Sequence, residues 1–128
     1  MDFRPKILSV DDSSTIRKVI KNAVQELNYT VLEASSGSEA LMVLSKEYES
    51  IKLILLDWNM PEMNGLELLK VIKKETLYRS IPVMMVTTEG EKENIVKAIQ
   101  AGVANYLLKP FTAEELAIKV KQCVGRGK

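Results

Sequence analysis

Two hydrophobic patterns alternate along this 128-residue chain. Short apolar runs recur, and three of them are rich in consecutive Val, Ile or Leu, which is typical of strands covered on both faces. Between these runs, apolar residues recur every three or four positions, which indicates one face of a helix. The pattern predicts five strands, at Ile7–Val10, Thr30–Glu33, Leu53–Leu56, Val83–Thr87 and Tyr106–Leu108.

Helical stripes lie between and after the predicted strands. Thr112 and Glu115 have the spacing of a capping box that would open the last helix. Strands that alternate with helices favour an α/β fold, a doubly wound five-stranded parallel sheet with helices on both faces. We expect one domain over residues 1–128, with a frayed tail at 125–128. The stripes are Ile16, Val19, Ile20, Ala23, Val24 and Leu27; Ala40, Leu41 and Leu44; Leu66, Leu69 and Ile72; Ile95, Ala98 and Ile99; and Leu116, Val120 and Val124.

Composition narrows the class of protein. Hydrophobic residues make up 46% and charged residues 27%, and the net charge of +1 does not favour nucleic acid as a partner. The single cysteine, Cys123, suits a reducing compartment. The chain has no apolar run of the roughly 18 residues that a membrane helix needs, and its first residues lack the features of a signal peptide. We therefore expect a soluble, cytoplasmic protein.

Histidine is absent from the sequence, which excludes several kinds of chemistry. Imidazole metal sites, Ser–His or Cys–His catalysis and phosphohistidine carriers all require this residue. The chain also contains no GxxxxGK[ST] or GxGxxG motif, so nucleotide binding is not favoured.

Polar residues gather where the predicted strands end. Asp11 and Asp12 follow the first strand, Asp57 follows the third, Thr87 ends the fourth and Lys109 follows the fifth. In open α/β sheets, ligands bind outside the carboxyl ends of the strands, where the strand order reverses. The topology therefore predicts that these side chains converge at one sheet edge.

Three carboxylates at one edge would repel one another and recruit a cation. An all-oxygen ligand set with room for water suits Mg²⁺ better than Ca²⁺. A carboxylate beside Mg²⁺, a lysine and a threonine has the parts of a phosphoryl-transfer site. We interpret Asp57 as a nucleophile that forms an aspartyl-phosphate, with Lys109 and Thr87 beside it.

Each of these residues also has an ordinary structural interpretation. Asp12 could be only a helix N-cap, Lys109 a solvated lysine and Thr87 a β-branched strand residue. Trp58 and Tyr106 could be packing residues. Their combination at one sheet edge favours a site over coincidence.

The segments VDDSS, LLDWNMPEMNG, MMVTTEG and NYLLKPF resemble the receiver domain of bacterial two-component response regulators. The resemblance covers essentially the whole chain and is strongest to the stand-alone chemotaxis regulators of that family. It implies a flavodoxin-like (βα)5 fold with strand order 2-1-3-4-5. It also implies a cis bond between Lys109 and Pro110, which is uncommon among X–Pro bonds.

The resemblance implies roles for the acidic residues. Asp57 would be the phosphoacceptor. Mg²⁺ would be bound by Asp12, Asp57 and the backbone carbonyl of Asn59, with Asp11 acting close by through water.

It also implies a switch and a surface for partners. Thr87 and Lys109 would contact the phosphoryl group, and the ring of Tyr106 would change rotamer on activation. Asn59 and Glu89 resemble positions that tune phosphoryl lifetime, while the expected partner surface consists of Ile95, Tyr106 and Lys119.

The expected function is a regulator rather than an enzyme, one that promotes its own phosphorylation and dephosphorylation. Its partners would be a CheA-like histidine kinase, a flagellar motor switch protein or another output protein, and a phosphatase; the chain would act as a monomer. A single-domain phosphorelay intermediate and a constitutive binding module remain alternatives. So does a Mg²⁺-dependent phosphohydrolase, although Asn59 stands where such enzymes usually carry a second Asp and no cap domain fits in this length.

Overall fold

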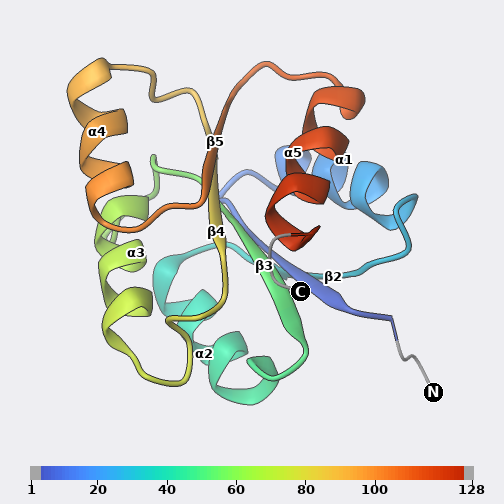
Figure 1. Ribbon diagram of the computed structural model, residues 1–128, viewed down its shortest axis with the longest axis horizontal. Coiled ribbons are helices and arrows are strands. Elements are labelled where there is room, and N and C mark those ends of the chain that lie inside the picture. The colour runs from blue at the N-terminus through green and yellow to red at the C-terminus, as the bar shows by residue number, and fades with distance from the viewer. Residues whose placement is uncertain (1–3, 126–128) are drawn as a thin grey trace.

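The computed structural model describes residues 4–125, which form a single parallel sheet with helices on both faces (Figure 1). The strand order is β2-β1-β3-β4-β5, and every neighbouring pair is parallel. The predicted fold class and strand order are confirmed. The elements are β1 (Lys6–Val10), α1 (Ser14–Gln25), β2 (Thr30–Ala34), α2 (Gly37–Glu47), β3 (Ile51–Leu56), α3 (Gly65–Lys74), β4 (Val83–Thr87), α4 (Lys92–Gln100), β5 (Asn105–Leu108) and α5 (Ala113–Gly125).

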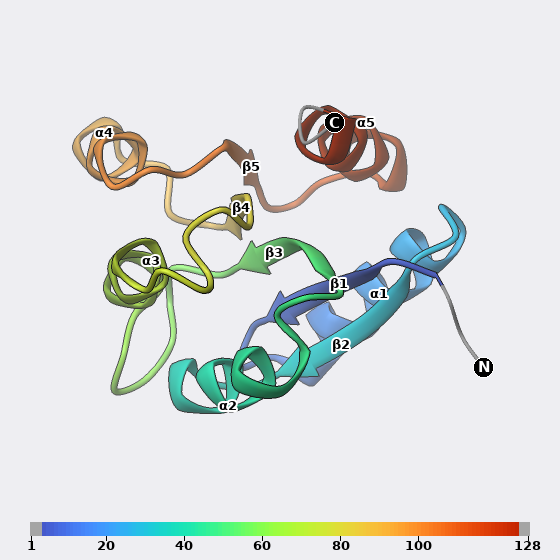
Figure 2. The same cartoon turned by 60° about the horizontal axis from the view of Figure 1, so that its bottom comes forward.

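The sheet separates two apolar cores. Helices α1 and α5 cover one face, and α2, α3 and α4 cover the other (Figures 1 and 2). Successive residues of a strand point to opposite faces, so Leu53 and Leu55 enter the α1–α5 core while Ile54 and Leu56 enter the second core. This double burial explains why the central strands are apolar at nearly every position.

The observed strands begin and end within two residues of the predicted positions, and the helices carry the predicted apolar stripes. Three residues differ from the prediction. Val19 and Ile99 belong to predicted stripes but are 49% and 60% exposed, because each stripe is wider than the face that its helix buries. Gly125, expected in the frayed tail, ends α5, whereas residues 126–128 lie outside the described part of the chain. Within residues 4–125, no helix is both long and apolar enough to cross a membrane.

Helix caps show which polar residues serve the fold. Ser13, not Asp12, is the N-cap of α1, and its Oγ accepts a hydrogen bond from the Ile16 N–H at 3.3 Å. The capping interpretation of Asp12 is therefore wrong. The capping box of Thr112 and Glu115 is confirmed, with hydrogen bonds of 2.8 and 3.1 Å.

One buried polar group is left without a partner in the described part of the chain. Ser9 lies in β1 with 0% exposure, and its hydroxyl has no hydrogen-bond partner there. A buried hydroxyl without a partner carries the cost of its lost hydration.

We predict that Ser9→Ala leaves the free energy of unfolding unchanged or raises it by up to about 1 kcal/mol, because it removes an unsatisfied hydroxyl. Leu8→Ala, on the opposite face of the same strand, should lower it by about 2–5 kcal/mol through a core cavity. Urea unfolding measures both values. A loss above about 1 kcal/mol in Ser9→Ala would show that the hydroxyl is satisfied.

Candidate functional site

Asp57 lies directly after β3, beside the end of β1. Its N–H donates a 2.9 Å hydrogen bond to the Val10 carbonyl, which continues the pairing of the two strands. The residue is only 5% exposed, and one carboxylate oxygen accepts a 3.3 Å hydrogen bond from the Asn59 N–H. Strand pairing therefore holds the backbone of Asp57, and the loop that follows binds its side chain.

Gly65 allows this loop to close tightly. Its N–H donates a 2.9 Å hydrogen bond to the Trp58 carbonyl as α3 begins. A Cβ at this position would lie 2.3 Å from the main-chain oxygen of Asp57 and 2.8 Å from the Trp58 Cα. Any larger residue would push α3 away from the backbone of Asp57.

Every polar group of Asp11 takes part in a hydrogen bond. Its N–H donates to the Ala34 carbonyl at 3.1 Å, and its carbonyl accepts from Arg17 at 2.6 Å. One carboxylate oxygen accepts from the Ser13 N–H at 2.9 Å, and the other accepts from Lys109 at 2.8 Å. Asp11 is thus a fixed negative charge at the end of β1.

Lys109 supplies positive charge to two buried carboxylates. Its Nζ lies 2.8 Å from Asp11 Oδ2 and 3.6 Å from Asp57 Oδ2, although 98 residues separate Lys109 from Asp11 along the chain. The bond that follows it, to Pro110, is cis, as the resemblance implies.

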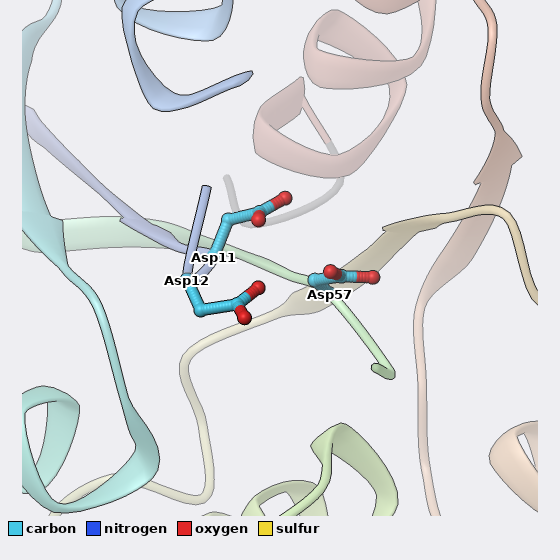
Figure 3. Close-up of side chains that lie close together, drawn as sticks. All are labelled: Asp11, Asp12 and Asp57. Carbon is cyan, nitrogen blue, oxygen red and sulfur yellow. The ribbon is translucent and has the colours of Figure 1, made fainter. Parts of the chain in front are cut away.

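Asp12 differs from its two acidic neighbours. It is exposed, and within residues 4–125 no hydrogen bond or ion pair involves its side chain. Asp11, Asp12 and Asp57 nevertheless each offer a carboxylate oxygen within 4.8 Å of the others, and Figure 3 shows the three side chains at the ends of β1 and β3. Three clustered carboxylate oxygens, one of them from the exposed Asp12, fit a hard cation that keeps part of its water, such as Mg²⁺.

Thr87 connects to Tyr106 through the backbone of Glu89. Thr87 Oγ1 accepts a 3.2 Å hydrogen bond from the Glu89 N–H, and the Tyr106 hydroxyl donates a 2.6 Å hydrogen bond to the Glu89 carbonyl. Burial is the main reason that the pKa of Tyr106 rises to about 12, with the charges of Glu89 and Asp57 adding to it. The phenol therefore remains a neutral donor at physiological pH.

The remaining predicted residues lie around this centre. Asn59 is exposed, and its side chain donates a 3.2 Å hydrogen bond to Thr88 Oγ1. Ile95 is half-buried on α4, and Lys119 on α5 donates a 3.2 Å hydrogen bond to the side chain of Asn105 in β5. Helices α4 and α5 flank β5 on opposite faces (Figure 2), so Ile95, Tyr106 and Lys119 come from three adjacent elements.

Sequence reasoning missed Arg17. This residue binds the main chain of Asp11 and the side chain of Glu33, yet in the sequence it is one of several basic residues on an amphipathic helix. Only its spacing after the acidic pair, one helical turn beyond the N-cap, could have pointed to it.

The pKa of Asp57 lies above its ordinary value of 3.8. Burial is the main cause, and the charge of Asp11 adds to it. The Thr87 hydroxyl, Lys109 and the Asn59 N–H oppose this rise without cancelling it. The folded chain therefore holds a proton on Asp57 more tightly than the unfolded chain does.

Comparison with known proteins agrees with this geometry. The model of the response regulator receiver domain family matches residues 7–121. The chain therefore belongs to the response regulator receiver domain family.

Relatives and solved structures extend the comparison. The chain is 50% identical to a Campylobacter jejuni protein named chemotaxis protein CheY homolog, over 95% of this chain and 94% of that protein. It is 46% identical to chemotaxis protein CheY1 of Helicobacter pylori, over 94% of this chain and 97% of that protein. The structure of Vibrio cholerae chemotaxis protein CheY4 superposes with a TM-score of 0.87 at 33% identity, covering 94% of this chain and 98% of that one.

We predict that Asp57→Asn raises the free energy of unfolding at neutral pH in metal-free buffer. The pKa of Asp57 is higher in the folded chain than in the unfolded chain. Stability is therefore lost as pH rises from the unfolded-state pKa through the folded-state pKa, because ionisation of this buried group destabilises the fold. The gain should shrink as pH falls towards 3.8, because wild-type Asp57 then becomes protonated. Chemical unfolding at several pH values, with a chelator present, measures this difference.

Glu62→Gln is the matched control for this experiment, since Glu62 is an exposed carboxylate in the same loop. It should leave the free energy of unfolding at neutral pH close to that of wild type. If Asp57→Asn were less stable than wild type at neutral pH, this would contradict the claim that burial of the Asp57 charge destabilises the fold.

Proposed function

We propose that this chain is a phosphorylation-activated response regulator that accepts a phosphoryl group on Asp57 and signals by changed binding to other proteins. The observation that carries the proposal is the position of Lys109, whose Nζ lies between two buried carboxylates at the carboxyl edge of the sheet. Such a cation beside a nucleophilic oxygen is suited to a phosphoryl group that arrives with negative charge. One receiver domain over residues 1–128 is part of the proposal.

The phosphoryl transfer needs little beyond positioning. An Asp57 carboxylate oxygen attacks the phosphorus of a phosphohistidine, a P–O bond forms, and the P–N bond breaks with its electron pair returning to the imidazole. Lys109 and the Thr87 hydroxyl contact the phosphoryl oxygens. Attack by water later releases phosphate and restores the carboxylate, a step that Asn59 and Glu89 tune from the rim of the site.

Mg²⁺ is the cofactor that the donor set fits. Asp12, Asp57 and the backbone carbonyl of Asn59 would hold the ion, with Asp11 acting through water. When bound, Mg²⁺ would supply positive charge to the phosphoryl oxygens and relieve the repulsion among the carboxylates. Asp12 is available for this role because its side chain makes no hydrogen bond or ion pair among the described residues.

The hydrogen bonds of Thr87 support a switch. When the Thr87 side chain moves towards a phosphoryl oxygen, its Oγ1 moves away from the Glu89 N–H and their 3.2 Å hydrogen bond is weakened. The Glu89 carbonyl accepts a hydrogen bond from Tyr106 in this structure. This carbonyl is held less firmly once the hydrogen bond of the neighbouring Glu89 N–H to Thr87 is weakened. Tyr106 moves into the space behind Thr87, and the surface around Ile95, Tyr106 and Lys119 changes shape.

Chemotaxis is the pathway that the names of the relatives favour. In this setting a CheA-like histidine kinase supplies the phosphoryl group, and a flagellar motor switch protein reads the activated surface. A phosphatase shortens the signal, and the chain works as a cytoplasmic monomer that needs neither nucleic acid nor a membrane. The chain is a regulator that promotes its own phosphorylation and dephosphorylation.

We predict that acetyl phosphate produces one phosphoryl adduct per chain, stable in acid and labile in base, only when Mg²⁺ is present. Asp57→Asn should abolish the adduct because it removes the nucleophile, whereas Glu62→Gln should retain it. Intact-mass spectrometry, with and without a chelator, measures both. Retention of the adduct in Asp57→Asn would place the acceptor elsewhere.

We predict that beryllofluoride, a phosphoryl mimic, strengthens binding of a peptide from the flagellar motor switch protein by about 1–3 kcal/mol. Thr87→Ala should shrink this gain because it removes the hydroxyl that links Asp57 to Glu89 and Tyr106. Thr88→Ala is the matched control: its exposed hydroxyl accepts from Asn59 and makes no contact with Glu89 among the described hydrogen bonds. Fluorescence anisotropy gives both affinities.

Equal affinity of this peptide for the free and the beryllofluoride-loaded protein would refute the Tyr106 switch. It would leave the phosphoacceptor role of Asp57 intact.

A further inference from the structure

Arg17 ties three elements together at the edge of the acidic cluster. Its Nη1 donates a 2.6 Å hydrogen bond to the main-chain oxygen of Asp11, at the end of β1. Its Nε donates a 3.1 Å hydrogen bond to Glu33 in β2. The side chain starts from α1 and is only 16% exposed. A planar guanidinium can bind two acceptors at once in a fixed geometry, which a lysine cannot reproduce.

The carbonyl that Arg17 binds belongs to the peptide between Asp11 and Asp12. The plane of this peptide sets the direction in which the Asp12 side chain leaves the backbone. The Asp12 carboxylate itself makes no hydrogen bond or ion pair within residues 4–125. Its direction therefore depends on restraints that act on its backbone, and Arg17 provides one of them.

Charge and geometry predict opposite effects of Arg17 on a cation in the cluster. A positive charge near a cation site weakens binding by repulsion, so removing that charge should strengthen it. If Arg17 orients the peptide, removing it should weaken binding despite the favourable change in charge. Outer residues that orient the ligands of a metal commonly change its affinity by about 10–100-fold.

We propose that Arg17 is a positioning residue that holds the Asp11–Asp12 peptide so that the Asp12 carboxylate faces Asp57. The inference rests on the proposed Mg²⁺ site and adds a residue to it. Arg17 touches neither the cation nor the phosphoryl group.

Lys21 provides a matched control on the same helix. Its Nζ lies 3.7 Å from the second carboxylate oxygen of Glu33, so it shares the ion-pair partner of Arg17. It makes no hydrogen bond or ion pair with Asp11 among the described residues, and its side chain is 40% exposed. Arg17→Met and Lys21→Met therefore remove the same charge, but only the first frees the Asp11 carbonyl.

The experiment is a Mg²⁺ titration of the full chain, followed by backbone amide NMR shifts at residues 57–59 and by Trp58 emission. Arg17→Met should bind Mg²⁺ about tenfold more weakly than wild type. The Mg²⁺ affinity of Lys21→Met should stay within about twofold of the wild-type affinity, because an exposed ion pair contributes little energy. Arg17→Lys keeps the charge but not the paired geometry, so it should also weaken binding, whereas Lys21→Arg should not.

Each outcome either supports or overturns the positioning role of Arg17. Mg²⁺ affinity in Arg17→Met equal to or above that of Lys21→Met overturns the positioning role and leaves the metal site standing. A wild-type chain that does not respond to Mg²⁺ overturns both. Unfolding in chelator separates the two kinds of effect: a loss of stability with unchanged Mg²⁺ affinity would make Arg17 merely structural. If Arg17→Met does not fold, Arg17→Lys and Lys21→Arg carry the same comparison.

Discussion

The ion pair between Lys109 and Asp11 is the constraint on which the carboxyl edge of the sheet depends. Asp11 and Asp57 are 2% and 5% exposed, and buried carboxylates are costly unless a cation accompanies them. Lys109 follows β5, one of the two edge strands, and its side chain reaches residues that follow β1 and β3, on the other side of β4 in the strand order. The strand order is therefore part of the site's electrostatics, because it sets the distance over which the Lys109 side chain reaches both carboxylates.

The fold and the convergence of the acidic residues were predictable because both follow from patterns that a sequence displays directly. Central strands such as β3 are buried on both faces, so they appear as continuous apolar runs. Parallel strands place their carboxyl ends at one edge, so Asp11, Asp57 and Lys109 had to meet once the topology was inferred.

Contacts to main-chain atoms were not predictable in this way. The sequence alone does not show that Arg17 binds a carbonyl whereas its neighbour Lys18 is exposed, because both are basic residues on the same amphipathic helix. The choice of Ser13 over Asp12 as N-cap depends on a one-residue difference in where α1 begins. Likewise, apolar spacing identified α4 but could not show that Ile99 lies outside the buried face.

The path from Thr87 to Tyr106 runs through backbone atoms of Glu89 rather than through its side chain. Glu89 contributes its N–H and its carbonyl, while its carboxylate accepts a 3.1 Å hydrogen bond from the Glu91 N–H. The carboxylate can thus change without breaking the two hydrogen bonds that join Thr87 to Tyr106.

The freedom of Asp12 has an evolutionary consequence. Because Ser13 caps α1 and Asp11 holds the end of β1, the fold does not need the Asp12 carboxylate. Substitutions there would leave a stable, well-packed chain. Descendants that have stopped responding to their input could therefore persist as folded adaptors, and gene duplication would have a short route from a signalling protein to a scaffold.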